Sequence, residues 1–204
     1  MARYMLAILV LLAMTFSANA AEAPIGTVKR VQAQVDALRA AAVLPLVVAS
    51  DLQADDILRS GENARLEAEL VDGTKLTLGA TAELKLDSYV YDPDHAARNR
   101  LVAKIQGAFL YIGGKVEAPG GEVKIITANA VMGVRGTTFW GGPIDNAYGV
   151  LALAGVVTVT TNGGSVTLTN GQGTIIHDAV APPEQPIVWP DAKRERAFAT
   201  IAFQ

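Results

Sequence analysis

With 204 residues, the chain has room for one domain, or for two domains only if both are small. Half of the residues are hydrophobic and only 18% are charged, a balance that supports a buried core and excludes a wholly disordered chain. The formal net charge is −3 and the basic residues are scattered, so the composition favours neither nucleic-acid binding nor a polybasic membrane patch.

The sequence contains no cysteine. This excludes disulfides, lipid attachment through an N-terminal cysteine, thiolate catalysis and cysteine-ligated metal sites. A secreted domain without disulfides must be stabilised by its hydrophobic core, and the chain is long enough to build one.

Residues 1–20 have the features of a secretory signal peptide. Arg3 supplies a positive charge, residues 4–16 (YMLAILVLLAMTF) form an apolar run, and the small residues of SANA follow it. We therefore expect cleavage after Ala20, a periplasmic or secreted mature chain, and no stable membrane anchor in that chain. An uncleaved anchor is the alternative, although the run is short for a bilayer span, which needs about 20 residues.

Residues 25–178 consist of short apolar runs separated by turns, which predicts an all-β domain. An alanine-rich apolar stretch is interrupted by Pro45, so we expect a loop that enters a strand at residues 46–48. Further along, Asp72-Gly73 separates two alternating runs (ARLEAELVDGTKLTLG) and is the strongest hairpin signal of the chain. About a dozen such runs with glycine-containing turns, and no long helix among them, predict many short strands in a solenoid-like or sandwich-like arrangement.

Residues 179–204 differ in character from the β domain. A proline-rich segment (APPEQPIVWP) precedes a predicted short helix, whose N-terminus Asp191 is expected to cap. The tail either packs back onto the β domain or binds a partner, and Trp189 could anchor it in both cases. The apolar stripe of the helix comprises Ala197, Phe198, Ile201 and Ala202.

No pattern in the sequence indicates a catalytic, metal or cofactor site. The two histidines, His95 and His177, lie far apart and outside any HExxH spacing, and no GxSxG motif is present. Residues 92–95 (DPDH) bring two carboxylates and an imidazole together, but they lack the loop that a calcium site requires. A solvated turn is therefore the preferred interpretation, and we expect that the protein is not an enzyme.

Two glycines, Gly133 and Gly136, flank an arginine in residues 130–140 (AVMGVRGTTFW). The segment has neither a Walker nor a GxGxxG pattern, and no helix follows it, so it does not predict a phosphate site. We expect the glycines to permit a sharp bend or a bulge within a strand.

Arg135 is the charged residue of this segment, and its apolar neighbours Val131 and Val134 predict partial shielding from water. A shielded guanidinium needs an acceptor, such as a carboxylate that binds it through two hydrogen bonds. Asp56 and Asp72 are the candidate partners because both are predicted to lie at turns. Arg135 is therefore expected to be a structural pin, and the alternative is a charge that faces a ligand.

Several segments together resemble the FecR-like domain family. The resemblance covers residues 26–177, and its most specific elements, DGTKLTL and TANAVMGVRGTTF, look like the strand–turn and GVRGT signatures of the family. It implies an extracytoplasmic all-β module, elongated and solenoid-like. The matching segments are residues 51–87, 101–115, 123–140 and 149–176. The residues that we single out as the structural motif are Asp56, Asp72, Gly73, Gly133, Arg135 and Gly136.

In well-known members of this family, the domain senses the signal of a siderophore receptor and regulates a sigma factor. The present chain shows no cytoplasmic sigma-binding region ahead of its hydrophobic segment, so only the periplasmic interaction role is expected to apply. We therefore predict a non-enzymatic module for protein–protein contact or envelope signalling, with an envelope protein as partner. The alternative is a module that binds cell-wall glycan or a small ligand, which the 6% aromatic content makes less favourable.

Overall fold

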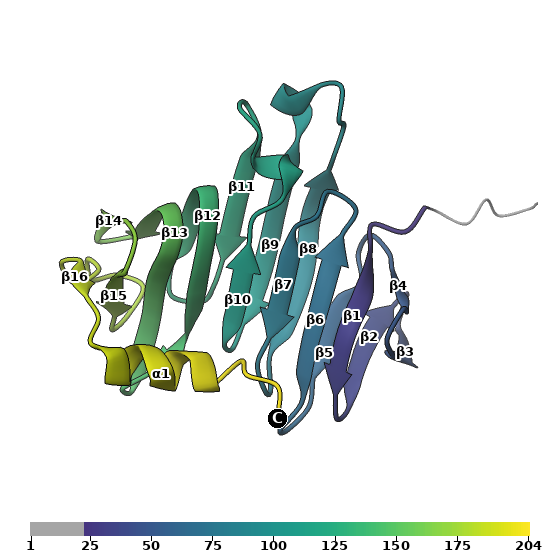
Figure 1. The fold of residues 1–204 in the computed structure, drawn as a ribbon, viewed down its shortest axis with the longest axis horizontal. Coiled ribbons are helices and arrows are strands. Elements are labelled where there is room, and N and C mark those ends of the chain that lie inside the picture. Colours follow the sequence, from purple (N-terminus) through teal and green to yellow (C-terminus); the bar gives the residue numbers. More distant parts are fainter. Residues whose placement is uncertain (1–22) are drawn as a thin grey trace, which may run out of the picture.

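The structure, a computed structural model, describes residues 23–204, so the predicted signal peptide lies outside the described residues. Sixteen strands of the described chain form one continuous hydrogen-bonded sheet, and a short α-helix follows them at the C-terminus (Figure 1). The prediction of an all-β fold with many short strands and a short C-terminal helix is therefore confirmed.

The first eight strands precede a short 3-10 helix, η1 (Ala96–Arg98). They are β1 (Gly26–Gln32), β2 (Val35–Arg39), β3 (Ala42–Pro45), β4 (Asp51–Leu52), β5 (Ile57–Ser60), β6 (Arg65–Leu70), β7 (Lys75–Leu78) and β8 (Glu83–Val90). The other strands flank a second 3-10 helix, η2 (Lys115–Glu117), and precede α1 (Asp191–Ala199). They are β9 (Arg100–Gln106), β10 (Phe109–Ile112), β11 (Glu122–Ile126), β12 (Val131–Ile144), β13 (Ala147–Thr161), β14 (Gly164–Leu168), β15 (Gln172–Ile176) and β16 (Ile187–Val188).

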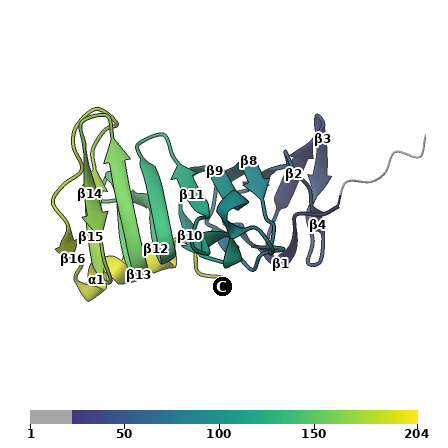
Figure 2. The same ribbon diagram turned by 90° about the horizontal axis from the view of Figure 1, so that it is seen from above.

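The sheet folds back on itself into two facing layers (Figure 2). The strand order is β3-β2-β5-β8-β9-β11-β12-β10-β7-β6-β1-β4, so both ends of this order come from the first strands of the chain. β12 joins the layers, because residues 131–133 pair with β11 whereas residues 138–141 pair with β10. β13 repeats this arrangement, with β15 paired to its first part and β14 paired to its last part.

The hydrophobic core lies between the two layers and follows the alternation of the sequence. In the hairpin of β6 and β7, Leu66 and Leu78 are directly opposite each other and fully buried, while the acidic residues between them are half-exposed. The turn of this hairpin contains Asp72-Gly73, as predicted. Gly73 has a φ of +88°, in the left-handed region that favours glycine. The local turn chemistry and the burial pattern therefore agree on one register.

One predicted strand is wrong. The strand that we expected at residues 46–48 instead occupies the residues directly before them, as β3. Residues 46–48 themselves lie outside any strand. The Leu46 N–H donates to the Val35 carbonyl, so the ring nitrogen of the preceding Pro45 faces the open edge of the sheet. Because no strand of the described part of the chain pairs with this edge, the missing N–H of Pro45 removes no ladder hydrogen bond and the strand tolerates the proline.

The C-terminal tail lies across the outer face of the layer that contains the second half of β12 (Figure 1). Trp140 projects from β12 and packs edge-on against Trp189, with ring centroids 6.1 Å apart, and its Nε1 donates to Thr200 Oγ1 at 3.0 Å. At the end of the tail, Arg30 lies over the Phe203 ring at 3.9 Å from its centroid. Aromatic packing and this cation–π contact therefore hold the tail against the β domain.

The predicted helix is present as α1, but Asp191 does not cap it. The N-cap residue is Pro190, and no side chain forms a cap hydrogen bond. Asp191 is instead the first residue of the helix and forms an ion pair with Arg194 at 3.3 Å. Its carboxylate still lies in the first turn, where the helix dipole favours a negative charge. Of the predicted apolar stripe, only Ala202 is exposed.

Candidate functional site

Asp72 lies at the turn between β6 and β7 and is only 2% exposed. Its Oδ1 accepts hydrogen bonds from the Thr74 N–H at 3.2 Å and from the Tyr89 hydroxyl at 2.9 Å. Its Oδ2 accepts from Thr74 Oγ1 at 2.7 Å and from the Val116 N–H at 2.9 Å. The carboxylate therefore connects the β6–β7 turn to β8 and to η2, and its hydrogen-bonding capacity is used within the fold.

Asp56 precedes β5 and is also buried. Arg39 on β2 binds it through two hydrogen bonds, from Nε to Oδ1 and from Nη2 to Oδ2, each 2.7 Å long. The Gln53 N–H donates to Oδ2 at 2.9 Å. The hydrogen bonds to Asp56 raise the pKa of the Arg39 guanidinium above its usual range. This bidentate pair connects β2 to the turn before β5.

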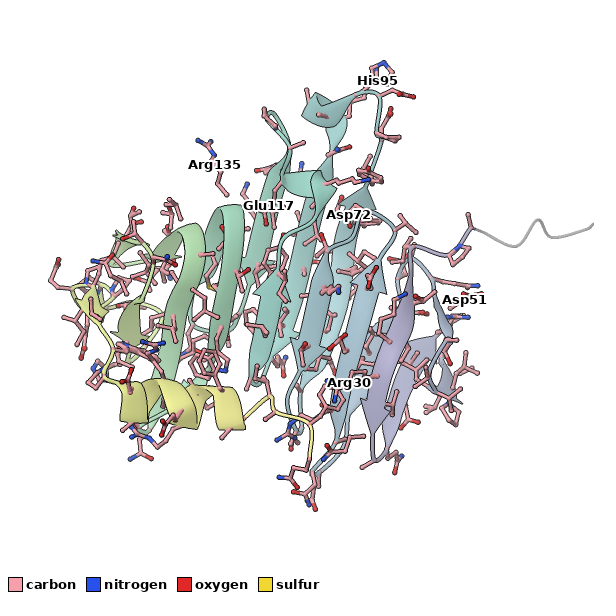
Figure 3. The ribbon with its side chains drawn as sticks, viewed as in Figure 1. Arg30, Asp51, Asp72, His95, Glu117 and Arg135 are labelled. Carbon is pink, nitrogen blue, oxygen red and sulfur yellow. The ribbon has the colours of Figure 1, made fainter. Side chains whose placement is uncertain are left out.

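The predicted pairing of Arg135 with Asp56 or Asp72 is therefore wrong. Both carboxylates are buried and bound to other groups, whereas the side chain of Arg135 is exposed and forms no hydrogen bond or ion pair within residues 23–204. Figure 3 shows Arg135 projecting away from the sheet, well apart from Asp72. Turn positions along the sequence do not determine which side chains meet in space, and β12 carries Arg135 to an outer corner of the fold.

Arg135, Gly136 and Thr137 form this corner, where β12 passes from one layer to the other; we call them the β12 corner. Gly136 adopts a φ of +60°. The Thr137 hydroxyl accepts a hydrogen bond from the Arg135 N–H at 2.9 Å and donates one to the Val156 carbonyl at 3.1 Å. β13 bends beside it at Gly155, with a φ of +72°, so the two paired strands turn the corner together.

Of the two glycines predicted to bend the strand, Gly136 lies at the bend and Gly133 does not. Gly133 lies in the regular ladder, opposite Lys124 of β11 and Thr158 of β13. A Cβ on Gly133 would meet no heavy atom within 4 Å. A side chain is therefore sterically possible at Gly133, whereas at Gly136 the backbone conformation opposes one.

Glu117, at the end of η2, is hydrogen-bonded to the β12 corner. Its Oε2 accepts a hydrogen bond from the Thr137 N–H at 3.0 Å, and its Oε1 accepts one from the Tyr111 hydroxyl at 2.7 Å. Gly113 leaves room for this carboxylate, because a Cβ at that position would overlap it. Burial raises the pKa of the Glu117 carboxyl above its usual value, and the two hydrogen bonds offset this effect only in part.

The stability contribution of Glu117 is expected to decrease as the pH rises. Because its folded-state pKa is raised, the folded protein binds this proton more tightly than the unfolded chain, and the resulting stability is lost between the ordinary value of 4.5 and the raised value. Glu117→Gln does not titrate, so its thermal midpoint should rise relative to the wild type as the pH increases from 4.5 through the raised pKa of Glu117.

Glu122→Gln is the matched control for this measurement. Hydrogen bonding and charge from Lys124 lower the pKa of Glu122, so its contribution is lost as the pH falls, the opposite direction. The midpoint of Glu122→Gln should therefore fall relative to the wild type as the pH rises toward 4.5, and should change little at higher pH, where Glu117→Gln changes. A difference between Glu117→Gln and the wild type that is constant with pH would contradict the assignment.

A shallow groove of about 410 Å³ lies between η2 and the β12 corner. Polar groups of its lining come from Lys115, Glu117, Thr137 and Thr138, and the rest comes from small residues that include Gly136. The Arg135 side chain leaves the backbone next to this groove, directed at solvent (Figure 3). The corner therefore presents a cation beside a shallow groove, on a backbone that is fixed by hydrogen bonds.

Both histidines are exposed, and each lies near one carboxylate. His95 Nδ1 is 2.8 Å from Asp92 Oδ2, within the predicted turn of the DPDH segment, and His177 Nε2 is 2.8 Å from Glu184 Oε1. His177 also borders a second shallow depression, of about 560 Å³. Within residues 23–204, no three histidine, aspartate or glutamate residues come together in a group that could hold a metal ion.

Sequence reasoning did not single out Glu117, Thr137 or Gly155, which form much of the candidate site together with Arg135. The available signal was weak. Glu117 is one acidic residue between two glycine pairs, and Gly155 lies within a long apolar run. Each acquires its role only through a contact with a distant part of the chain.

A family model described as FecR protein matches residues 56–166, more than half of the chain. The chain belongs to the FecR family. Proteins of the FecR family are signalling proteins associated with the cell envelope. The matched range includes the Asp72 network and the β12 corner, whereas Arg39 and Gln53, the partners of Asp56, lie ahead of it.

Two crystal structures of a candidate anti-sigma factor from Parabacteroides distasonis ATCC 8503 share the fold of this FecR chain, each with a TM-score of 0.55 and 16% sequence identity. The first match covers 70% of this chain and 64% of that protein, and the second covers 68% and 62%. The chain thus spans less than two thirds of that protein. No curated protein matches the sequence. The described residues include no helix with the length and apolar character needed to cross a membrane.

Proposed function

We propose that this FecR chain is a secreted periplasmic module that binds another envelope protein and has no enzymatic activity. Family membership supports a signalling or regulatory role. The leader-like sequence of residues 1–20 supports export. The observation that carries the proposal is Arg135, a charged side chain that points outward from a rigid corner of the fold (Figure 3).

Arg135 is suited to recognition because its backbone is constrained while its side chain is exposed. Its own N–H donates to Thr137 Oγ1, and Glu117 accepts the N–H of Thr137. A guanidinium presented in this way binds a carboxylate through two hydrogen bonds, and arginine is enriched among the residues that dominate binding energy at interfaces. The partner therefore presents an acidic group to the β12 corner.

Binding of cell-wall glycan is less well supported. Small-ligand sites are concave and lined largely by apolar and aromatic side chains. In residues 23–204, every aromatic side chain of Phe, Tyr and Trp is buried or half-buried, and Trp140 of β12 packs against Trp189 of the tail. The groove beside the β12 corner is shallow, and no aromatic side chain lines it. These features favour contact with a protein.

Replacing Arg135 with alanine is expected to leave the thermal midpoint nearly unchanged, because exposed side chains without partners contribute within about 0.5 kcal/mol. The same variant should recover at least about tenfold less partner in affinity capture from periplasmic extract, as expected for a residue that dominates an interface. Arg98→Ala is the matched control, since Arg98 is also exposed but lies on η1, and it should capture the partner as the wild type does.

A clearly lower midpoint for Arg135→Ala, with capture retained, would restore the structural-pin interpretation. Equal losses of capture in the Arg135 and Arg98 variants would indicate a general charge effect and contradict a role specific to the β12 corner. If the wild-type protein recovers no protein reproducibly, the proposed function itself is wrong.

A further inference from the structure

Residues 40–49 (AAAVLPLVVA) contain no charged or hydrogen-bonding side chain. They comprise the turn before β3, β3 itself and the turn after it, and we call them the apolar edge segment. All of them except Leu46 are exposed, and Val43, Val47 and Val48 reach 63%, 65% and 60%. The segment lies at one end of the two-layered sheet (Figure 2). Contiguous exposed apolar surface of this kind marks an interaction site.

Among residues 23–204, β3 is the last strand at this end of the sheet order and pairs with β2 alone. The Leu46 N–H donates to the Val35 carbonyl, and Leu44 lies opposite Ala37 in the same register. Backbone polar groups alternate between the two sides of a strand, so the N–H and C=O of Val43 point away from β2. Val43 therefore has both backbone groups available at the open edge.

The positions that follow Val43 on this edge offer no further donor. Pro45 has no N–H, and the Val47 N–H donates to Ser50 Oγ at 3.0 Å. The edge can therefore make one complete pair of backbone hydrogen bonds, centred on Val43, and not an extended ladder.

We propose that the apolar edge segment binds a second copy of this chain, by antiparallel pairing of β3 with β3 about a two-fold axis next to Val43. The two Val43 residues exchange both backbone hydrogen bonds, as residues of a hydrogen-bonded antiparallel pair do. A two-fold axis makes the contact self-complementary. The cross-strand neighbours in this register are all apolar: Val43 opposite Val43, Ala42 opposite Leu44, and Ala41 opposite Pro45.

A second copy fits this edge better than a strand of another protein or a lipid surface. A longer strand of another protein would find a single backbone N–H donor on this edge and could not form an extended ladder. The two-fold arrangement needs only the N–H of Val43 from each copy. Lipid surfaces are bound through apolar segments flanked by basic residues. The charged residues of the adjacent β2 are Asp36 and Arg39, and Arg39 is already held in an ion pair. This inference does not depend on the proposed function.

The first test is the molecular mass of the purified protein, measured by light scattering over a range of concentrations. We expect a concentration-dependent dimer that Val43→Asp weakens at least about tenfold, since the substitution brings two carboxylates together at the two-fold axis. Val180→Asp is the matched control, because Val180 is 71% exposed and lies between β15 and β16, at the other end of the sheet. It should dimerise as the wild type does.

The absence of cysteine from the chain permits a second, independent test. The Cα atoms of a hydrogen-bonded antiparallel pair lie about 5.5 Å apart, within the range of a disulfide. Val43→Cys should therefore form a covalent dimer under mild oxidation at least about tenfold faster than Val180→Cys, because only the former is held next to its own copy. Circular dichroism of each variant should match the wild type, since both positions are exposed.

Three outcomes would overturn the inference. The first is a protein that is monomeric at every concentration, with Val43→Cys cross-linking no faster than Val180→Cys. The second is a dimer that Val43→Asp leaves intact, which would place the contact on another surface. The third is a monomer that binds lipid vesicles and loses this binding in Val43→Asp, which would assign the apolar edge segment to a membrane surface.

Discussion

Replacing Asp72 with alanine is expected to lower the free energy of unfolding by about 3 kcal/mol or more. The substitution removes the acceptor of the Val116 N–H, the Thr74 N–H and hydroxyl, and the Tyr89 hydroxyl. A buried donor left without a partner costs about 1–3 kcal/mol, and Thr74 and Val116 are fully buried. In a domain of this size, 1 kcal/mol shifts the thermal midpoint by about 2–4 °C, so a decrease of about 10 °C is expected in thermal melting.

Two further variants separate the lost hydrogen bonds from unspecific effects. Asp72→Asn keeps the shape of the side chain and one acceptor oxygen, so it should lose less stability than the alanine variant. Asp51→Ala removes an exposed carboxylate on β4 that forms no side-chain hydrogen bond within residues 23–204, and should change stability by no more than about 0.5 kcal/mol. An Asp72→Ala protein as stable as Asp51→Ala would show that the buried network is dispensable.

Gly155→Ala is expected to be the most damaging single-methyl substitution at the corner, with a loss of about 3 kcal/mol. Gly155 has a positive φ of +72°, which alanine adopts only with strain. A Cβ at this position would also overlap the carbonyl oxygen of Gly136 in the adjacent strand. Relief of this overlap requires β12 and β13 to separate where both cross between layers. Chemical denaturation of the purified variant measures the loss.

Gly133→Ala and Gly136→Ala separate the cost of backbone strain from the cost of steric overlap. At Gly136 the φ of +60° is unfavourable for alanine, but an added Cβ would meet no heavy atom within 4 Å. The free energy of unfolding should therefore fall by about 1 kcal/mol, from backbone strain alone. At Gly133 neither obstacle exists, and stability should stay within about 0.5 kcal/mol of the wild type. A different order of the three variants would contradict the role assigned to the strand crossing.

The features that follow from the sequence alone are those specified by neighbouring residues. The Asp72-Gly73 turn predicts its hairpin because glycine adopts the positive φ of the turn and the flanking residues alternate with a period of two. The same alternation in the other runs predicts an all-β fold, and the GVRGT segment supports the family. Each of these signals depends on a backbone preference or on a pattern within about ten residues, which a single sequence displays directly.

The partners of the charged side chains were decided only by the tertiary structure. The sequence predicts that Arg135 pairs with Asp56 or Asp72, because its apolar neighbours suggest shielding and both carboxylates are predicted to lie at turns. In the folded chain Tyr89 and Val116 bind Asp72, while β12 carries Arg135 to the surface (Figure 3). Glu117 acquires its role from residues 6 and 20 positions away. The decisive step is the return of the sheet onto itself at β12, because it sets which distant segments meet. That step depends on contacts across the whole core, and no local pattern encodes it.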